Sequence, residues 1–177
     1  MMMEASIAGG MDAFYDNATE LRLEKFTDEH YKPNERYYEL SGQEIHKLDF
    51  PRQHDGKLIK VLFGGLRNFV AHDPGYLIVF MHRPFEEVRQ SYEAAINRKL
   101  PYTQEILETR LEETRLICMQ RRDMKLIDVE YHDVLESPLH VFQWLAGQGW
   151  LADPVKAARV VDKRKRRFFG PELAIGA

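Results

Sequence analysis

The sequence predicts an α/β protein in which helices cover both faces of a parallel sheet. Three apolar runs typical of buried strands alternate with segments whose apolar residues recur at helical spacing. The runs are Lys57 to Phe63 (KLIKVLF), Tyr76 to Met81 (YLIVFM) and Met124 to Tyr131 (MKLIDVEY). The run Tyr76 to Met81 is unbroken, which fits a strand that is buried on both faces. Because no repeat or linker divides the chain, we predict a single domain over residues 1–177.

The other predicted elements have ends marked by glycines, prolines or capping residues. Before the first long strand they are a helical turn or two over residues 1–8, ended by Gly9 and Gly10; a short strand over residues 12–16; a helix over residues 41–48, with Ser41 and Glu44 as a capping box; and a turn-rich loop over residues 49–56. Later they are a helical turn over residues 66–70 and helices over residues 103–122, with Thr103 as N-cap, 137–148, opened by Ser137 and Pro138, and 153–161, opened by Asp153 and Pro154.

Residues 76–91 (YLIVFMHRPFEEVRQS) predict a strand, a sharp turn and a helix. Pro84 suits the first turn of a helix, because its missing N–H would have no partner there. Glu86 and Glu87 lie in that same turn, where the helix dipole favours negative charge. Ligands of parallel α/β sheets bind at the carboxyl ends of strands. Arg83, at the end of this strand, is therefore the first candidate for a binding residue.

Composition is that of an ordinary soluble globular protein, with 44% hydrophobic and 30% charged residues. The net charge of −3 gives no reason to expect nucleic-acid binding. Cys118 is the single cysteine, which excludes an intramolecular disulfide and a cysteine-based zinc site and favours a reducing cytoplasm. No apolar run approaches the ~20 residues of a membrane span. We therefore expect a cytoplasmic protein with no membrane span and no nucleic-acid partner, in an oligomeric state that the sequence does not indicate.

Several segments resemble those of the sulfotransferases that use 3′-phosphoadenosine-5′-phosphosulfate. RPFEEVRQS, in which Ser91 follows Arg83 by eight positions, resembles their 3′-phosphate-binding motif. VEYHDVLESP (129–138) resembles a later strand and turn of the family. MMMEASIAGGMDAFYD (1–16) and YKPNERYYE (31–39) resemble segments that follow the P-loop in small bacterial and phage-type relatives. The resemblance covers most of the chain and implies a three-layer, P-loop-type fold.

The resemblance implies transfer of a sulfuryl group from this nucleotide co-substrate to a hydroxyl or amine of a small-molecule acceptor, without a metal. By the same resemblance Arg83 and Ser91 would bind the 3′-phosphate and Tyr131 would touch the adenine. Arg166 and Arg167, in the basic C-terminal tail (163–177), would close over the phosphate. Each has a structural alternative: an arginine paired with a nearby carboxylate, a hydroxyl bonded within its helix, an aromatic at the core edge, and a solvated charge run.

The catalytic base is not identified by the resemblance. Many eukaryotic sulfotransferases carry a Lys-Thr-His arrangement, and the corresponding residues here are 60–62 (KVL), without histidine. A base is needed to take the proton of the acceptor as the sulfuryl group transfers. Glu39, His46 and His72 are the weak candidates.

The family's first strand and P-loop would precede Met1, so the sequence looks like an N-terminally truncated sulfotransferase-type domain. Successive backbone N–H groups of a P-loop surround a phosphate, and catalysis would require that loop to be restored. A non-catalytic remnant or interaction module that binds 3′-phosphonucleotides therefore stays open. So does a kinase-like P-loop relative, although the sequence has no acidic pair placed to hold magnesium and no arginine-rich lid in mid-chain.

Overall fold

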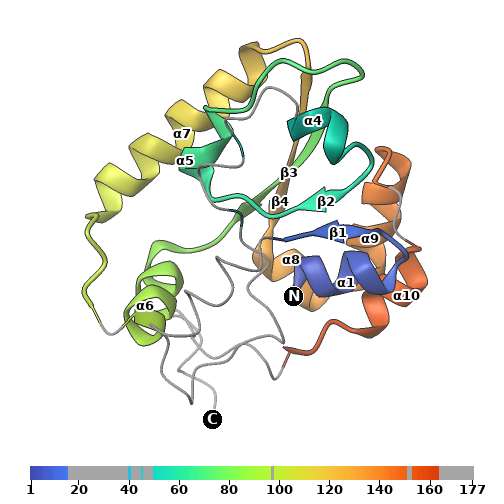
Figure 1. The fold of residues 1–177 in the computed structure, drawn as a ribbon. Coiled ribbons are helices and arrows are strands. Elements are labelled where there is room, and N and C mark those ends of the chain that lie inside the picture. The colour runs from blue at the N-terminus through green and yellow to red at the C-terminus, as the bar shows by residue number, and fades with distance from the viewer. Residues whose placement is uncertain (16–39, 41–44, 46–49, 97, 151–152, 164–177) are drawn as a thin grey trace.

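Two pairs of parallel strands lie among helices in the computed structural model (Figure 1), which describes residues 1–15, 40, 45, 50–96, 98–150 and 153–163. The first pair is β1 (Ala13–Phe14) with β2 (Leu58–Ile59), and the second is β3 (Tyr76–His82) with β4 (Met124–Glu130). The predicted α/β class with parallel strands is confirmed, although the strand pairs are small.

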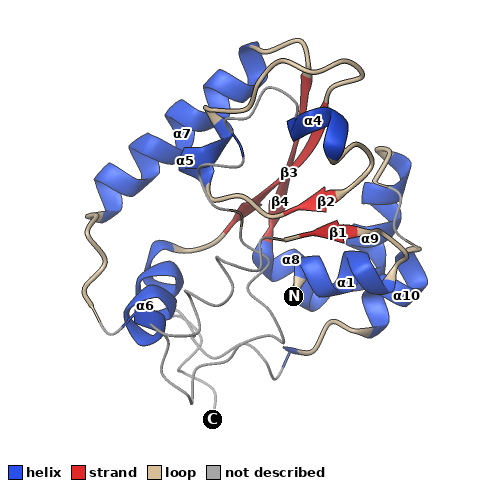
Figure 2. Cartoon of the chain, in the orientation of Figure 1, coloured by secondary structure: helices blue, strands red, loops and turns tan. Residues whose placement is uncertain are grey.

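Eight helices occur in the described part of the chain, and Figure 2 shows them around the strands. They are α1 (Met2–Ala8), α4 (Phe50–Gln53), α5 (Phe63–Leu66), α6 (Phe85–Ile96), α7 (Gln104–Gln120), α8 (Tyr131–Glu136), α9 (Pro138–Gly147) and α10 (Pro154–Arg159). The predicted caps of two of them are confirmed. The Thr103 hydroxyl accepts from the backbone N–H of Ile106, and the Asp153 carboxylate accepts from two N–H groups of α10.

Side chains of β3 alternate between two apolar clusters, one on each face of the β3–β4 pair. Tyr76, Ile78 and Phe80 pack in one cluster and Leu77, Val79 and Met81 in the other. The first cluster includes residues of α4, α5 and α7, and the second includes residues of α1, α8, α9 and α10. Helices thus cover both faces of β3 and β4, which explains the unbroken apolar run of β3 from Tyr76 to Met81.

Two segments differ from the sequence predictions. The strand predicted over residues 57–63 pairs only at Leu58–Ile59, and Phe63 already begins α5. Leu62 is 58% exposed, so this apolar run is not buried throughout as a central strand would be. The loop predicted over residues 49–56 contains α4, because the buried Phe50 anchors one helical turn. The helix predicted over residues 41–48 lies largely outside the described residues.

The amino ends of β3 and β4 are closed by structural contacts around Arg121. Its guanidinium donates to the carbonyl oxygen of Phe69 at 2.5 Å and to the Asp123 carboxylate at 2.6 Å. This pairing lowers the pKa of Asp123. Gly75 lies against the same Asp123. Its φ is +104°, which favours glycine, and a Cβ at this position would lie only 2.8 Å from the Asp123 carbonyl oxygen. Any open polar site on this strand pair therefore has to lie at the other end.

None of the helices in the described ranges is both long enough and apolar enough to cross a membrane.

Candidate functional site

The carboxyl ends of β3 and β4 bring two predicted nucleotide-binding residues together. The parallel register pairs His82 with Glu130, so the next residues, Arg83 and Tyr131, leave the two strands side by side. The guanidinium carbon of Arg83 lies 4.7 Å from the centroid of the Tyr131 ring. This is the distance of a cation–π contact. Tyr131 does not end the strand as predicted but begins α8, which turns the chain away at this point.

A buried carboxylate fixes the position of Arg83. The Glu87 side chain is 0% exposed, and its Oε2 accepts from Arg83 Nε at 3.2 Å. Its Oε1 lies 2.9 Å from Nε2 of His132, which follows Tyr131 on α8. A buried charge is tolerated when it is paired and hydrogen-bonded in this way. The structural alternative for Arg83, pairing with a nearby carboxylate, thus holds for its Nε.

The terminal nitrogens of Arg83 stay available for an anion. Within the described part of the chain, its hydrogen bonds involve Nε alone, and the side chain is 24% exposed. A guanidinium carries five N–H donors, of which four lie on the two terminal nitrogens. They form the edge that recognises a phosphate with two parallel hydrogen bonds.

Ser91 lies on the helix face along which Arg83 points. Glu87 follows Arg83 by four positions and Ser91 follows Glu87 by four, and residues at this spacing stack on one face of a helix. Ser91 is half-buried and lies about 9 Å along α6 from Phe85, at 1.5 Å per residue. The Arg83–Glu87 pair therefore draws the arginine about halfway toward Ser91, a relation that the eight-residue spacing alone did not reveal.

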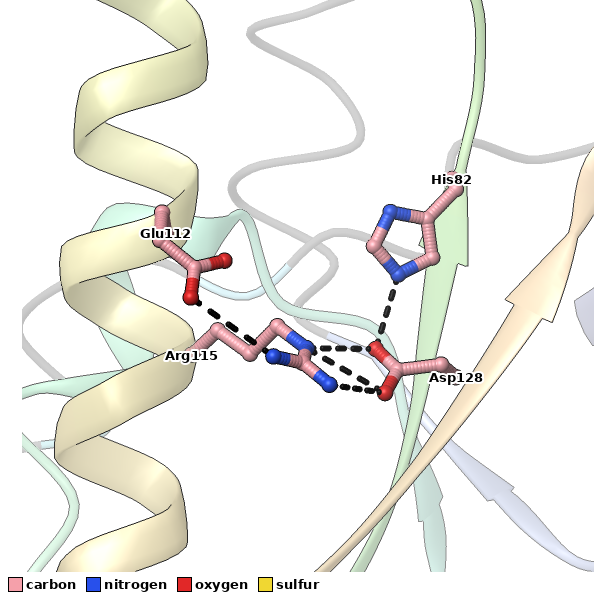
Figure 3. Close-up of polar contacts among 4 residues, drawn as sticks. All are labelled: His82, Glu112, Arg115 and Asp128. Atoms are coloured by element: carbon pink, nitrogen blue, oxygen red, sulfur yellow. Dashed lines mark hydrogen bonds and ion pairs between the residues drawn. The ribbon is translucent and has the colours of Figure 1, made fainter.

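A second polar cluster lies on the face of the strand pair that α7 covers (Figure 3). His82 Nε2 lies 2.7 Å from Asp128 Oδ1, and Asp128 belongs to β4. Arg115 of α7 donates to both oxygens of Asp128, from Nε at 3.0 Å and from a terminal nitrogen at 2.7 Å. Glu112, one turn earlier on α7, lies 3.6 Å from the Arg115 guanidinium. The hydrogen bonds from Arg115, followed by that from His82, lower the pKa of Asp128 to about 2.

Sequence reasoning missed this second cluster. In the sequence, His82 stands at the end of the apolar run 76–81, and Asp128 is one residue of the predicted strand MKLIDVEY. The available signal was the carboxylate inside an otherwise apolar strand, since such a group needs a charged partner when it is buried. The partners of Asp128 depend on the register of β3 and β4 and on the position of α7 over the strands. Sequence periodicity specifies neither.

No family model, no curated protein and no solved structure matches this chain.

His72, a predicted candidate for the catalytic base, lies at the opposite end of β3 from Arg83. Its backbone N–H donates to Asp123, and its Nε2 lies 3.8 Å from Asp55 Oδ1. The seven residues of β3 span about 20 Å at ~3.3 Å per residue, which separates the two groups. His72 and Arg83 do not belong to one site.

The remaining predicted site residues, Glu39, His46, Arg166 and Arg167, lie outside the described residues. The first lysine of the basic run is described: Lys163 Nζ lies 2.8 Å from Glu136 Oε2, at the end of α8. The basic run thus starts beside the helix that Tyr131 begins.

The described residues contain no group of three or more histidine, cysteine, aspartate or glutamate side chains placed to hold a metal ion. Cys118 is buried in the core, and burial raises the pKa of its thiol. A hollow of about 720 Å³ lies between α5 and α7, lined among others by Gly64, Arg67 and Arg110. Neither polar cluster at the strand ends contributes to the lining of this hollow.

Proposed function

We propose that this protein is a sulfotransferase-type protein whose Arg83 binds the 3′-phosphate of 3′-phosphoadenosine-5′-phosphosulfate. One observation carries the proposal. Arg83 and Tyr131 stand in contact at the carboxyl ends of neighbouring parallel strands, where α/β proteins bind their ligands. Both residues belong to the segments that resemble the sulfotransferase family.

Arg83 suits a phosphate better than a lysine would. Its Nε is already used by Glu87, which holds the planar group in one orientation. A fixed guanidinium loses little further freedom when it binds, and its terminal nitrogens match two phosphate oxygens. Ser91, on the same helix face, is the proposed second contact. The Tyr131 ring is the proposed platform for the adenine, since aromatic rings stack on bases of any kind.

The proposal includes a three-layer, P-loop-type fold and transfer of the sulfuryl group to a hydroxyl or amine. Helices on both faces of β3 and β4 are compatible with such a fold. The positive charge of Arg83 would stabilise the negative charge that develops on the nucleotide as the sulfuryl group leaves.

Calorimetric titration with adenosine 3′,5′-bisphosphate tests the proposal. The parent chain is expected to bind, and Arg83→Ala to weaken binding by roughly 10- to 100-fold, the value of a hydrogen bond between charged groups. Arg89→Ala is the matched control. Arg89 lies on the same helix but pairs with Glu86 and Glu93, so its loss should change the affinity by less than about threefold.

Circular dichroism of each variant establishes that it folds. Because Arg83→Ala leaves the buried Glu87 without that partner, Arg83→Gln, which keeps a donor, serves as the second variant. A folded parent that does not bind the bisphosphate, or equal losses in the Arg83 and Arg89 variants, would refute the proposal.

A further inference from the structure

The polar cluster of His82, Asp128 and Arg115 is not used by the proposed nucleotide site. We propose that His82 is the general base that takes the proton from the acceptor's hydroxyl or amine through its Nδ1. This inference rests on the proposed function and adds the residue that the resemblance to sulfotransferases leaves unassigned.

The hydrogen bond to Asp128 sets which ring nitrogen can act. A carboxylate only accepts, so the 2.7 Å contact requires a proton on His82 Nε2. In the neutral imidazole the other nitrogen, Nδ1, then carries the lone pair. Figure 3 shows Nδ1 on the side of the ring that faces away from Asp128. In the described part of the chain Nδ1 has no hydrogen-bond partner, and the His82 side chain as a whole is 34% exposed.

Asp128 is held as an acceptor by its other partner. Arg115 donates hydrogen bonds to both oxygens of Asp128, which fixes the carboxylate plane and keeps Asp128 ionised. The pKa of Asp128 of about 2 agrees with this arrangement. An ionised, oriented carboxylate behind a histidine selects its tautomer and stabilises the imidazolium that forms when the ring takes a proton.

Among the described residues, the charged groups that face the imidazole come from two elements. Asp128 approaches from β4, while Arg115 and Glu112 approach from α7. Arg115 lies on the far side of the Asp128 carboxylate from His82. Its positive charge offsets the negative charge of that carboxylate.

A purely structural role explains His82 less well. Arg115 already ties α7 to β4 with three hydrogen bonds to Asp128, and the His82 ring is too exposed to be a core brace. His82 also directly precedes Arg83, with consecutive Cα atoms about 3.8 Å apart. One strand end thus carries both the proposed nucleotide anchor and a histidine with an available lone pair.

The proposed step balances as follows. An oxygen or nitrogen lone pair of the acceptor forms a bond to the sulfur of 3′-phosphoadenosine-5′-phosphosulfate. The bond from sulfur to the 5′-phosphate oxygen breaks, and its electron pair leaves with adenosine 3′,5′-bisphosphate. The acceptor's proton moves to His82 Nδ1 and later returns to solvent. Sulfur keeps its oxidation state, so no oxidant or reductant is required.

The test measures transfer from this nucleotide to 2-naphthol and to 2-naphthylamine, detected by mass spectrometry, across a pH series. For His82→Gln we expect a fall in rate of about 10²- to 10⁴-fold and loss of the acid limb of the pH profile. Its affinity for adenosine 3′,5′-bisphosphate should stay within about twofold of the parent value, a change below ~0.4 kcal/mol. His140→Gln, at an exposed position of α9, should retain both the rate and the pH profile.

The outcomes separate this inference from the proposed function. If the parent binds the bisphosphate and His82→Gln keeps its rate and acid limb, His82 is not the general base, but the nucleotide-binding proposal is unaffected. If a parent that binds transfers to neither probe, the protonation of the His82 ring decides: a proton on Nε2 in ring-nitrogen correlation spectra supports the assignment, and a proton on Nδ1 overturns it. A parent that does not bind overturns both proposals. If His82→Gln does not fold, ring-nitrogen correlation spectra of the parent decide: a proton on Nε2 supports the assignment, and a proton on Nδ1 overturns it.

Discussion

Arg83 donates from Nε to a carboxylate oxygen of Glu87 at 3.2 Å, and the Glu87 side chain is completely buried. Glu87 also contacts His132, so one buried charge joins the start of α6 to α8 across the ends of two strands. The pair matters for function because it orients the guanidinium whose terminal nitrogens are proposed to bind phosphate. It matters for stability because removing one partner of a buried pair leaves the other uncompensated.

Glu87→Gln should therefore destabilise the protein by about 2 kcal/mol, because an amide replaces a buried acceptor that serves two donors. The free energy of unfolding from urea titration measures this loss. Glu86→Gln is the control: Glu86 pairs with Arg89 on the surface of the same helical turn, and its replacement should change stability little. Equal effects of the two substitutions would contradict the burial-based account.

Asp128→Asn should lower stability at neutral pH and lose that effect in acid. The pKa of Asp128 falls from its ordinary value of 3.8 to about 2 in the folded chain, chiefly through Arg115. A depressed carboxyl pKa adds stability above the unfolded-state value, and that stability is lost as pH falls through the folded-state value. Melting temperatures of parent and variant should converge between about pH 4 and pH 2. A gap that is independent of pH would show that the carboxylate charge is not responsible.

Arg121→Gln should destabilise the fold without affecting nucleotide binding. Arg121 holds Phe69 and Asp123 at the amino ends of the strands, so its loss should cost roughly 1–3 kcal/mol in urea unfolding. The neighbouring exposed residue supplies the control, Arg122→Gln. The affinity of both variants for adenosine 3′,5′-bisphosphate should equal that of the parent. A loss of affinity confined to Arg121→Gln would indicate that the nucleotide binds at the amino ends of β3 and β4, contrary to the proposal.

Tyr131→Leu should weaken adenosine 3′,5′-bisphosphate binding by roughly tenfold, whereas Tyr131→Phe should not. Leucine removes the ring that meets Arg83 and would stack on the base, and such stacking contributes about 1–3 kcal/mol. Phenylalanine keeps the ring. Calorimetry on both variants distinguishes the cases, and an equal loss in Tyr131→Phe would mean that the hydroxyl rather than the ring is responsible.

The sequence pattern predicted the strand and helix that carry the site, but fewer of the contacts between the site's side chains. β3 and α6 follow from an unbroken apolar run and from Pro84 with two acidic residues after it. β2 is shorter than its apolar run, and that run is not buried throughout, since Leu62 is 58% exposed. The Arg83–Glu87 pair was open to prediction from the four-residue spacing that neighbours share on a helix.

The contacts between distant segments could not be predicted in the same way. Arg83 meets Tyr131, and His82 meets Asp128, because β3 and β4 pair in one particular parallel register. A slip by one residue would move every side chain to the other face. Long-range register depends on how α7 and α9 pack on the strands, and the local sequence of β3 and β4 does not contain that information.

The central claim is that Arg83 recognises a 3′-phosphate, and the most direct measurement compares two nucleotides on two proteins. The account predicts that the parent binds adenosine 3′,5′-bisphosphate at least about tenfold more tightly than adenosine 5′-monophosphate, and that Arg83→Ala abolishes this preference. Equal affinities for the two nucleotides in the parent, or a preference that survives in Arg83→Ala, would contradict it.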